Sequence, residues 1–158
     1  LVEYAAHLVP EGGYYAVPEL AGNGLIVVGD AAGLVNISLY HEGSNLAMAS
    51  GRFAAEAVLQ ARLKGDFSRA TLSSYEKSLR KSFVMADLEK YRDVPELYRR
   101  LPQLLSLYPR RVCRLLVDYY RNSQEPKKAI QREAIRRFFA GIPKAKMAID
   151  LIRARKLI

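Results

Sequence analysis

Asp30 is the residue whose surroundings best indicate chemistry. It stands in the stretch 29–33, which reads GDAAG and follows the apolar run 25–28 directly. An acid at the carboxyl end of a parallel strand lies where α/β sheets bind ligands, and it can accept a hydrogen bond from a sugar-like hydroxyl. The small flanking residues Gly29 and Gly33 let the backbone approach a large flat ligand. The stretch predicts a ligand-binding turn, although a short motif of this kind can also be purely structural.

A second candidate lies at the start of the helix that follows this turn. Gly43, Ser44 and Asn45 begin that helix. The amide groups of a first helical turn have no partner within the helix, and the positive end of the helix dipole favours negative charge. A ligand that gains negative charge on reduction would suit this position.

Three other reactive side chains have plainer interpretations. His41 precedes the helix and could touch a ligand, but we interpret it as a loop residue without a role, and His7 as a structural residue of a strand. Cys113 stands beside arginines and is interpreted as an inert thiol. The two histidines are far apart and unsupported, so no metal site is predicted. No Ser-His-Asp arrangement and no P-loop motif is present.

The pattern along the chain predicts an α+β fold that is predominantly α. Short strands are expected over 2–9, 13–17 and 25–28, and the last of these reads as a parallel strand buried on both faces. Apolar and small residues then recur at three- and four-residue steps and predict a helix of about five turns that ends at Gly65. We therefore expect residues 1–65 to be the end of an α/β ligand-binding domain and 66–158 to be a helical region.

Only helices are expected from residue 71 onward. A capping box at Ser73–Glu76 predicts the first start, with a buried stripe at Leu72, Tyr75, Leu79, Phe83 and Ala86. Prolines 95, 102 and 109 are each suited to a first helical turn. The later helices are predicted to bury Val112, Leu115, Leu116, Tyr119 and Tyr120, then Ile130, Ile135, Phe138 and Phe139, and finally Met147, Ala148, Leu151 and Ile152.

Charge divides the chain unevenly. Residues 1–60 carry a formal charge of −5 and residues 61–158 carry +14. The basic part suits an acidic protein, an anionic membrane surface or nucleic acid, or it serves solubility alone. No aromatic residues alternate with Arg110, Arg111 and Arg114, so nucleic acid ranks low. No apolar run reaches the length of a membrane span. The expected location is the cytoplasm, with peripheral contact at the inner face of the membrane as an alternative.

Residues 24–58 resemble the second flavin-binding motif of FAD-dependent oxidoreductases. The likeness rests on GDAAGLVN at 29–36, EGSNLAMASG at 42–51 and AAEA at 54–57. The nearest group is the electron-transfer-flavoprotein:quinone oxidoreductases, particularly the FixC-type dehydrogenases, and geranylgeranyl reductases are similar but more distant. Looser likeness extends over 4–10 and 68–109.

The resemblance implies that the cofactor is FAD. Asp30 would bind its ribityl chain beside the pyrophosphate, and Gly29 and Gly33 would let the backbone close on the cofactor. The amides that would meet the pyrimidine edge of the flavin are those of Gly43, Ser44 and Asn45. Stabilising negative charge at that edge favours the reduced flavin.

The resemblance also implies electron transfer from a reduced carrier, such as an electron-transfer flavoprotein, to a quinone or a ferredoxin-like protein. Quinone oxidoreductases proper hold an iron–sulfur cluster that one cysteine cannot ligate, whereas FixC-type members use a separate ferredoxin-like partner. The family's Gly-x-Gly-x-x-Gly segment is absent, so this chain is expected to match only the last third of the family and, alone, to bind FAD weakly or not at all. A prenyl-lipid reductase and a flavin-free basic interaction module stay open.

Overall fold

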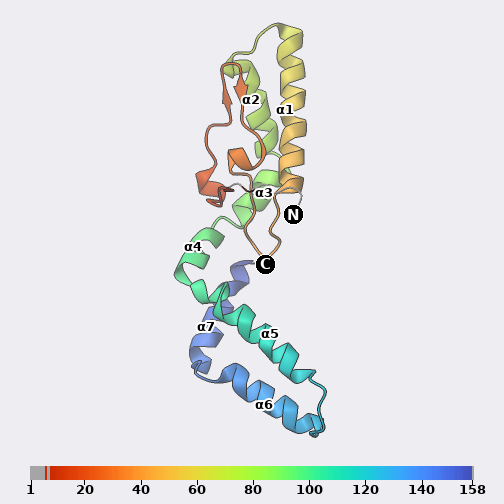
Figure 1. Ribbon diagram of the computed structural model, residues 1–158. Coiled ribbons are helices and arrows are strands. Elements are labelled where there is room, and N and C mark those ends of the chain that lie inside the picture. The colour runs from red at the N-terminus through yellow and green to blue at the C-terminus, as the bar shows by residue number, and fades with distance from the viewer. Residues whose placement is uncertain (1–5, 7, 158) are drawn as a thin grey trace. The chain divides into compact units, whose positions relative to one another are not determined.

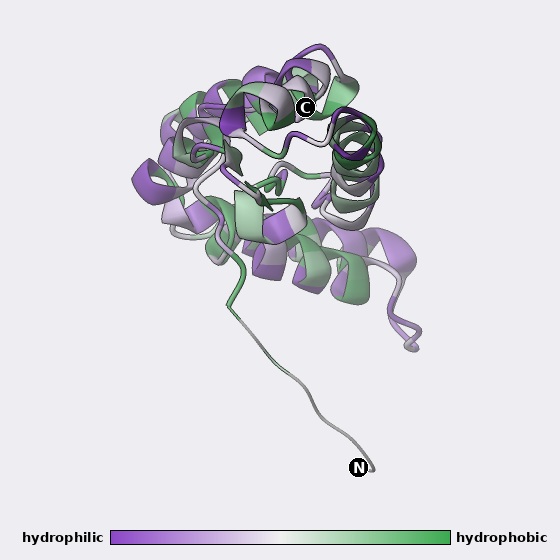
Figure 2. Cartoon of the chain, turned by 90° about the horizontal axis from the view of Figure 1, so that it is seen from above, coloured by the Kyte–Doolittle hydropathy of each residue, from purple (hydrophilic) through white to green (hydrophobic). Residues whose placement is uncertain are grey.

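A computed structural model describes residue 6 and residues 8–157. These fall into two compact units, one of which ends at Pro95 and includes Leu157, while the other comprises residues 96–156. Helices dominate both units (Figure 1). Green and purple segments alternate along most of the helices in Figure 2, as expected for amphipathic helices that bury one face. The predominantly helical character predicted from sequence is confirmed.

The first unit joins a short hairpin to three helices. Its elements are η1 (Tyr14–Ala16), β1 (Ala21–Gly22), β2 (Leu25–Ile26), η2 (Gly29–Ala32), α1 (Ser44–Lys64), α2 (Arg69–Arg80) and α3 (Phe83–Lys90). The main hydrophobic core of this unit gathers Leu20, Ala32, Leu34, Leu46, Ala54, Ala57, Tyr75, Leu79, Val84, Met85 and Leu88. This core places η2 against the beginning of α1, which matters for the site.

The long helix α1 is formed as its sequence pattern predicts. Its buried face consists of Leu46, Ser50, Ala54, Ala57 and Ala61, mostly small residues that allow α2 to pack closely beside it (Figure 1). Gly65 ends the helix in the left-handed conformation at φ 65°, which favours glycine because it has no Cβ.

The predicted strands are largely wrong. Residues 25–28 do not form a parallel strand buried on both faces: β2 pairs antiparallel with β1, and Leu25 is 60% exposed. The two-residue turn Asn23-Gly24, with φ 70° at Gly24, brings the local partner within reach and forms the hairpin. Residues 13–17 form η1 after Gly13, not a strand. Of the strand predicted over 2–9, Ala6, Leu8 and Val9 have no regular structure, and the remainder, with His7, lies outside the described residues.

The predicted start of α2 is also wrong. The helix begins at Arg69, not at a capping box over Ser73–Glu76, because the Asp66 carboxylate already accepts hydrogen bonds from the Ser68 amide, the Ser68 hydroxyl and the Thr71 hydroxyl. Glu76 Oε1 instead accepts the amides of Leu20 and Ala21 at 2.9 and 3.0 Å. Glu76, which was predicted to belong to a capping box, therefore connects α2 to the hairpin.

The stripe predicted for α2 is half right. Leu72, Tyr75 and Leu79 are buried, but Phe83 and Ala86 are exposed. The helix stops at Arg80, and Ser82 starts α3 by accepting the amide of Val84, so the phase of the buried face changes. Val84, Met85 and Leu88 are buried in α3 instead.

The second unit is a set of short helices separated near prolines. They are α4 (Val94–Arg100), which starts at the end of the first unit, η3 (Pro102–Leu104), α5 (Leu107–Tyr119), α6 (Lys127–Phe139) and α7 (Lys144–Ala154), followed by η4 (Arg155–Leu157). Prolines 95, 102 and 109 each lie in the first turn of their element, as predicted. Helices α5 and α6 pack against each other.

Only some of the residues predicted to be buried in these helices are buried. Ile130 is buried, whereas Val112, Leu116, Tyr120, Ile135, Leu151 and Ile152 are exposed. The polar centre of the unit is Asp150, which is 2% exposed and accepts hydrogen bonds from Tyr108 Oη at 2.6 Å and Gln103 Nε2 at 2.9 Å. Over the described residues, no helix is both long and apolar enough to cross a bilayer.

Candidate functional site

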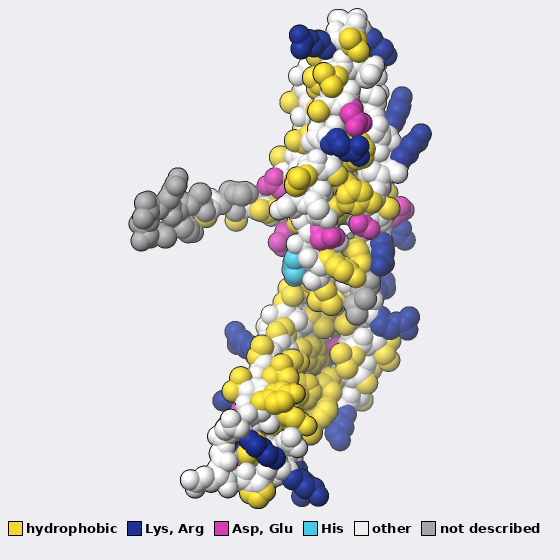
Figure 3. Space-filling model, turned by 90° about the vertical axis from the view of Figure 1, so that its right-hand side faces the viewer, with side chains coloured by type: hydrophobic (Ala, Val, Ile, Leu, Met, Phe, Trp, Pro, Cys, Tyr) yellow, Lys and Arg dark blue, Asp and Glu magenta, His cyan; other side chains and the backbone are white. Residues whose placement is uncertain are grey.

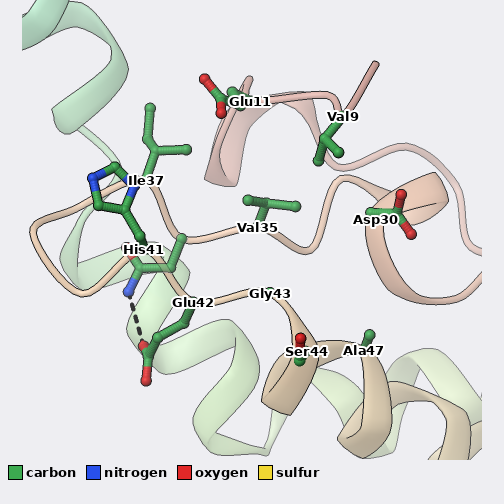
Figure 4. Close-up of a pocket in the computed structure, with 11 residues that line it drawn as sticks. Val9, Glu11, Asp30, Val35, Ile37, His41, Glu42, Gly43, Ser44 and Ala47 are labelled. Atoms are coloured by element: carbon green, nitrogen blue, oxygen red, sulfur yellow. Dashed lines mark hydrogen bonds between the residues drawn. The ribbon is translucent and has the colours of Figure 1, made fainter. Parts of the chain in front are cut away.

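A pocket of about 460 Å³ lies within the first unit between η2, the loop that follows it and the start of α1. It is lined by Val9, Glu11, Asp30, Val35, Asn36, Ile37, His41, Glu42, Gly43, Ser44 and Ala47. Figure 4 shows Asp30 and Ala47 at one end of this pocket and His41 and Ile37 at the other. Three of the six residues predicted from sequence, Asp30, Gly43 and Ser44, therefore line one cavity.

Asp30 is held by a tight turn that two glycines make possible. Gly29 and Gly33 have φ values of 64° and 70°, a region that L side chains rarely adopt. The amide of Gly29 donates to Ser50 Oγ at 2.9 Å, and the amide of Gly33 donates to the Asp30 carbonyl at 2.8 Å. A Cβ on Gly29 would lie 3.3 Å from that of Ala47. The glycines do not line the pocket, but they bring the turn against α1 and fix Asp30 at its end.

The start of α1 is open to the pocket. Its N-cap is Gly43, which offers no capping side chain, and the first internal hydrogen bond runs from the Ala47 amide to the Gly43 carbonyl at 2.8 Å. The amides of the first turn therefore have no acceptor within the helix. A Cβ added at Gly43 would meet nothing within 4 Å. The geometry leaves N–H donors and the positive helix end available to a ligand.

Asn45 lies in the first turn of α1, and the prediction for it concerns its backbone amide. Its side chain does not line the pocket but donates from Nδ2 to Glu42 Oε1 at 3.1 Å. The other carboxylate oxygen of Glu42 accepts from Asn36 Nδ2 at 3.2 Å, the bond drawn as a dashed line in Figure 4. Glu42 thus ties the loop to the first turn of α1.

The loop over 36–42 is closed by backbone pairing as well. Asn36 and Glu42 form an antiparallel bridge with N···O distances of 2.8 and 3.0 Å, and Asn36 is 1% exposed. His41 sits in this loop with φ 46°, an uncommon value for a residue other than glycine. Sequence reasoning missed Asn36 and Glu42. The three-residue spacing of Glu42 and Asn45 was a usable local signal, but the Asn36 bond depends on the loop's closure.

The charges around the pocket limit what it can bind. Three carboxylates line it, those of Glu11, Asp30 and Glu42, together with His41 and no lysine or arginine. Carboxylates accept hydrogen bonds from hydroxyls and repel phosphate, so this set of acceptors fits the hydroxyl-bearing chain of a ligand better than its pyrophosphate. Within the described part of the chain, no group of three His, Cys, Asp or Glu residues could hold a metal ion.

Comparison with known proteins extends these observations. Residues 94–158 match the sequence model of the ETF-QO/FixC family C-terminal domain. The chain is 45% identical to protein FixC of Azorhizobium caulinodans over 86% of its length, which covers 32% of that protein. It is 38% identical to a probable electron transfer flavoprotein-quinone oxidoreductase of Escherichia coli over 84% of its length and 31% of the relative. The chain thus spans about a third of these two relatives.

A third relative is matched almost from end to end. The chain is 40% identical to protein FixC of Rhizobium leguminosarum, and the match covers 96% of the chain and 94% of that sequence. Both the turn that carries Asp30 and the later helices therefore lie in a region shared with such relatives.

Proposed function

The chain belongs to the ETF-QO/FixC family, and from this premise we propose that it is the carboxyl-terminal portion of an FAD-dependent oxidoreductase. The proposed reaction passes electrons from a reduced carrier of the electron-transfer-flavoprotein type, through FAD, to a quinone or a ferredoxin-like acceptor. Residues 1–65 would complete the FAD-binding domain, and 66–158 would form its helical carboxyl-terminal region.

One observation carries the proposal. Asp30 and the uncapped first turn of α1 line the same cavity, although they are separated by thirteen residues of turn and loop. One supplies an acceptor for hydroxyls and the other supplies N–H donors for a group that carries negative charge. A flavin with a ribityl chain presents both kinds of group.

Different residues of the pocket would contact different parts of the cofactor. Asp30 would accept hydrogen bonds from the ribityl hydroxyls, and the amides at Gly43, Ser44 and Asn45 would face the flavin's pyrimidine edge. Gly29 and Gly33 would keep the turn close enough to α1 for both contacts. The pyrophosphate and ADP portions would be held by parts of the full-length protein beyond this pocket, because no basic side chain lines it.

FAD supplies the redox chemistry when it is bound, and the protein positions it and tunes its charge. The positive end of α1 would stabilise the negative charge that the reduced ring acquires, which favours reduction. The carboxylate of Glu42 would keep the first turn in place through its hydrogen bond with Asn45.

The partners follow from the same premise. The E. coli relative is named for an electron transfer flavoprotein and a quinone. With one cysteine, this chain cannot ligate an iron–sulfur cluster by cysteines alone, so a separate ferredoxin-like protein is proposed as the alternative acceptor. The proposed location is the cytoplasm, with peripheral contact at the inner face of the membrane.

The test is the flavin content of the full-length protein. We expect native protein to purify yellow, with the visible spectrum of bound flavin, and Asp30→Ala to lower the ratio of flavin to protein. Glu56→Gln is the matched control, because Glu56 is an exposed acid on α1 that pairs only with Arg52 among the described residues. A colourless native protein would refute the proposal, and equal flavin in Asp30→Ala and Glu56→Gln would refute the role of Asp30.

A further inference from the structure

Two buried hydroxyl groups lie behind the turn that carries Asp30. Ser50 of α1 and Tyr75 of α2 are both 0% exposed. Every other buried residue of these two helices is a leucine or an alanine, so each helix places one polar group among its apolar contacts. A buried polar group is costly unless it forms hydrogen bonds, so the partners of these two hydroxyls are informative.

Both hydroxyls hold the backbone that leads into this turn. The Tyr75 hydroxyl donates to the Val27 carbonyl at 3.1 Å. Ser50 Oγ accepts the Gly29 amide at 2.9 Å, and the Ser50 hydroxyl itself donates to the Ala47 carbonyl at 2.8 Å. A serine hydroxyl has one hydrogen, so the bond to Ala47 leaves its lone pairs for the Gly29 amide. The chain is thus tied to two different helices within the stretch 27–29.

Tyr75 suits this role because its phenol stays a donor. Burial raises the pKa of Tyr75, and hydrogen bonding with Ser50 only partly offsets this increase. A protonated phenol can donate to a carbonyl, whereas a phenolate can only accept. On the same helix, Glu76 accepts the amides of Leu20 and Ala21. Two successive residues of α2 therefore hold both the hairpin and the chain that leaves it.

Neither hydroxyl lies in the pocket itself. Acidic side chains contribute to the lining of the pocket, and Ser50 and Tyr75 do not. Figure 3 shows Asp and Glu side chains gathered on the surface close to the cyan histidine, whereas the two hydroxyl-bearing residues are fully covered. The two hydroxyls can therefore influence a bound ligand only through the turn, which makes any role in the site one of positioning.

We propose that Ser50 and Tyr75 are positioning residues of the flavin site, which keep the Asp30 turn at a fixed place relative to the start of α1. This inference rests on the proposed function. Ser50 belongs to α1, so its bond to Gly29 directly joins the two parts of the site that would contact the ribityl chain and the pyrimidine edge. Without this bond, a flavin held by Asp30 would shift relative to the positive end of α1, which would then stabilise the reduced ring less. The two hydroxyls thus set both the affinity for flavin and its midpoint potential.

The experiment compares the bound flavin of the full-length Ser50→Ala and Tyr75→Phe proteins with that of native protein. Each apoprotein is titrated with FAD, and the potential of the bound flavin is measured by reductive titration against a reference dye. Loss of one hydrogen bond typically changes an equilibrium about fivefold, so each variant should bind FAD about fivefold more weakly than native. The midpoint potential should become more negative, because the reduced form loses more stabilisation than the oxidised form.

The matched controls are Ser74→Ala and Tyr15→Phe. Ser74 donates to the Thr71 carbonyl at 2.9 Å, three residues earlier as for Ser50, but it accepts no amide from any described residue. Tyr15 is 72% exposed. Both controls should keep the native affinity and potential. A variant that is only less stable would hold less flavin, but the flavin that it does hold would have the native potential.

Hydrogen exchange of the flavin-free protein, followed by mass spectrometry, supplies a second readout. Ser50 Oγ accepts the Gly29 amide, so Ser50→Ala should speed the exchange of this amide about fivefold, whereas Ser74→Ala should leave it unchanged. A native potential in both Ser50→Ala and Tyr75→Phe, or unchanged exchange at Gly29 in Ser50→Ala, would overturn this inference alone if native protein is yellow. A colourless native protein would refute the proposed function, and this inference with it.

Discussion

The glycines on either side of Asp30 determine where its side chain lies. Gly29 and Gly33 take backbone conformations that turn the chain sharply, and Ser50 of α1 accepts the Gly29 amide. A substitution that moves this turn away from α1 also moves the Asp30 carboxylate relative to the backbone amides at the start of α1. Substitutions at residues that do not line the pocket can therefore change the geometry of the site.

Gly29→Ala tests this dependence. Its φ of 64° is costly for alanine, and the new Cβ would stand 3.3 Å from that of Ala47, so we expect a loss of about 1–2 kcal/mol in the free energy of unfolding. Gly51→Ala is the control, because Gly51 lies inside α1 with open space around it and alanine should stabilise a helix interior by about 0.5–1 kcal/mol. Urea unfolding of the full-length protein measures both. A Gly29→Ala protein as stable as native would show that the turn is not constrained.

The residues that support the site were only partly predictable. The GDAAG stretch marked Asp30 because glycines and alanines around an acid are a local signal. Glu42 and Asn36 were missed because their contacts arise only when the loop over 36–42 closes on itself. The bond between Asn45 and Glu42 joins residues three positions apart and was predictable from local spacing.

At the scale of elements, the hydrogen bonds that Asp66 accepts at the start of α2 make stability depend on pH. Hydrogen bonds from Thr71, and then from Ser68, hold the pKa of Asp66 below its usual value. A carboxyl whose pKa is depressed by folding stabilises the protein above its unfolded pKa of about 3.9 and loses that contribution as the pH falls through the folded value. We expect native protein to exceed Asp66→Ala in thermal unfolding midpoint near neutral pH, and the difference to shrink at acidic pH.

The control for this pH dependence is Glu56→Ala, which removes an exposed acid from α1. Its midpoint should stay near the native one throughout, because exposed ion pairs contribute little. A difference between native and Asp66→Ala that is constant from neutral to acidic pH would contradict the stabilising role of the Asp66 carboxylate.

The buried polar contact between α5 and α7 supplies a second test at this scale. Burial, followed by the hydrogen bond to Asp150, raises the pKa of Tyr108 to about 12. Burial alone would raise the pKa of Asp150, but the hydrogen bonds from Tyr108 and Gln103 outweigh it and the pKa is lowered. The carboxylate is thus held charged in a buried place by its two donors.

Tyr108→Phe removes one of these donors. Because a hydrogen bond to a buried charge is worth about 1.5–3 kcal/mol, we expect the free energy of unfolding to fall by that amount. Tyr120→Phe is the matched control, since the Tyr120 side chain is 74% exposed and should not affect stability measurably. Equal stability of the two variants in urea would show that Asp150 does not need the tyrosine.

Helices were predicted better than strands for a physical reason. The period of small and apolar residues in α1 and the left-handed stop at Gly65 are local properties, so both were predicted correctly. Residues 25–28 form an apolar run that fits a buried strand, but its actual pairing is set by the Asn23-Gly24 turn, which favours the antiparallel hairpin. Tyr120 and Leu116 fit a helical core pattern equally well, yet both are exposed.

At the scale of the whole molecule, the proposed flavin chemistry belongs to one of the two units. Every described residue that lines the Asp30 pocket comes from the first unit. The formal charge follows the same division, −2 for residues 1–95 against +11 for residues 96–156.

The most direct test of the central claim is the structure of the full-length protein with its flavin bound. The account predicts that the Asp30 carboxylate lies within hydrogen-bond distance of a hydroxyl on the cofactor's sugar-alcohol chain, and that the first-turn amides of α1 face the pyrimidine edge of the ring. A flavin bound elsewhere, with Asp30 and α1 far from both its ring and its chain, would contradict it.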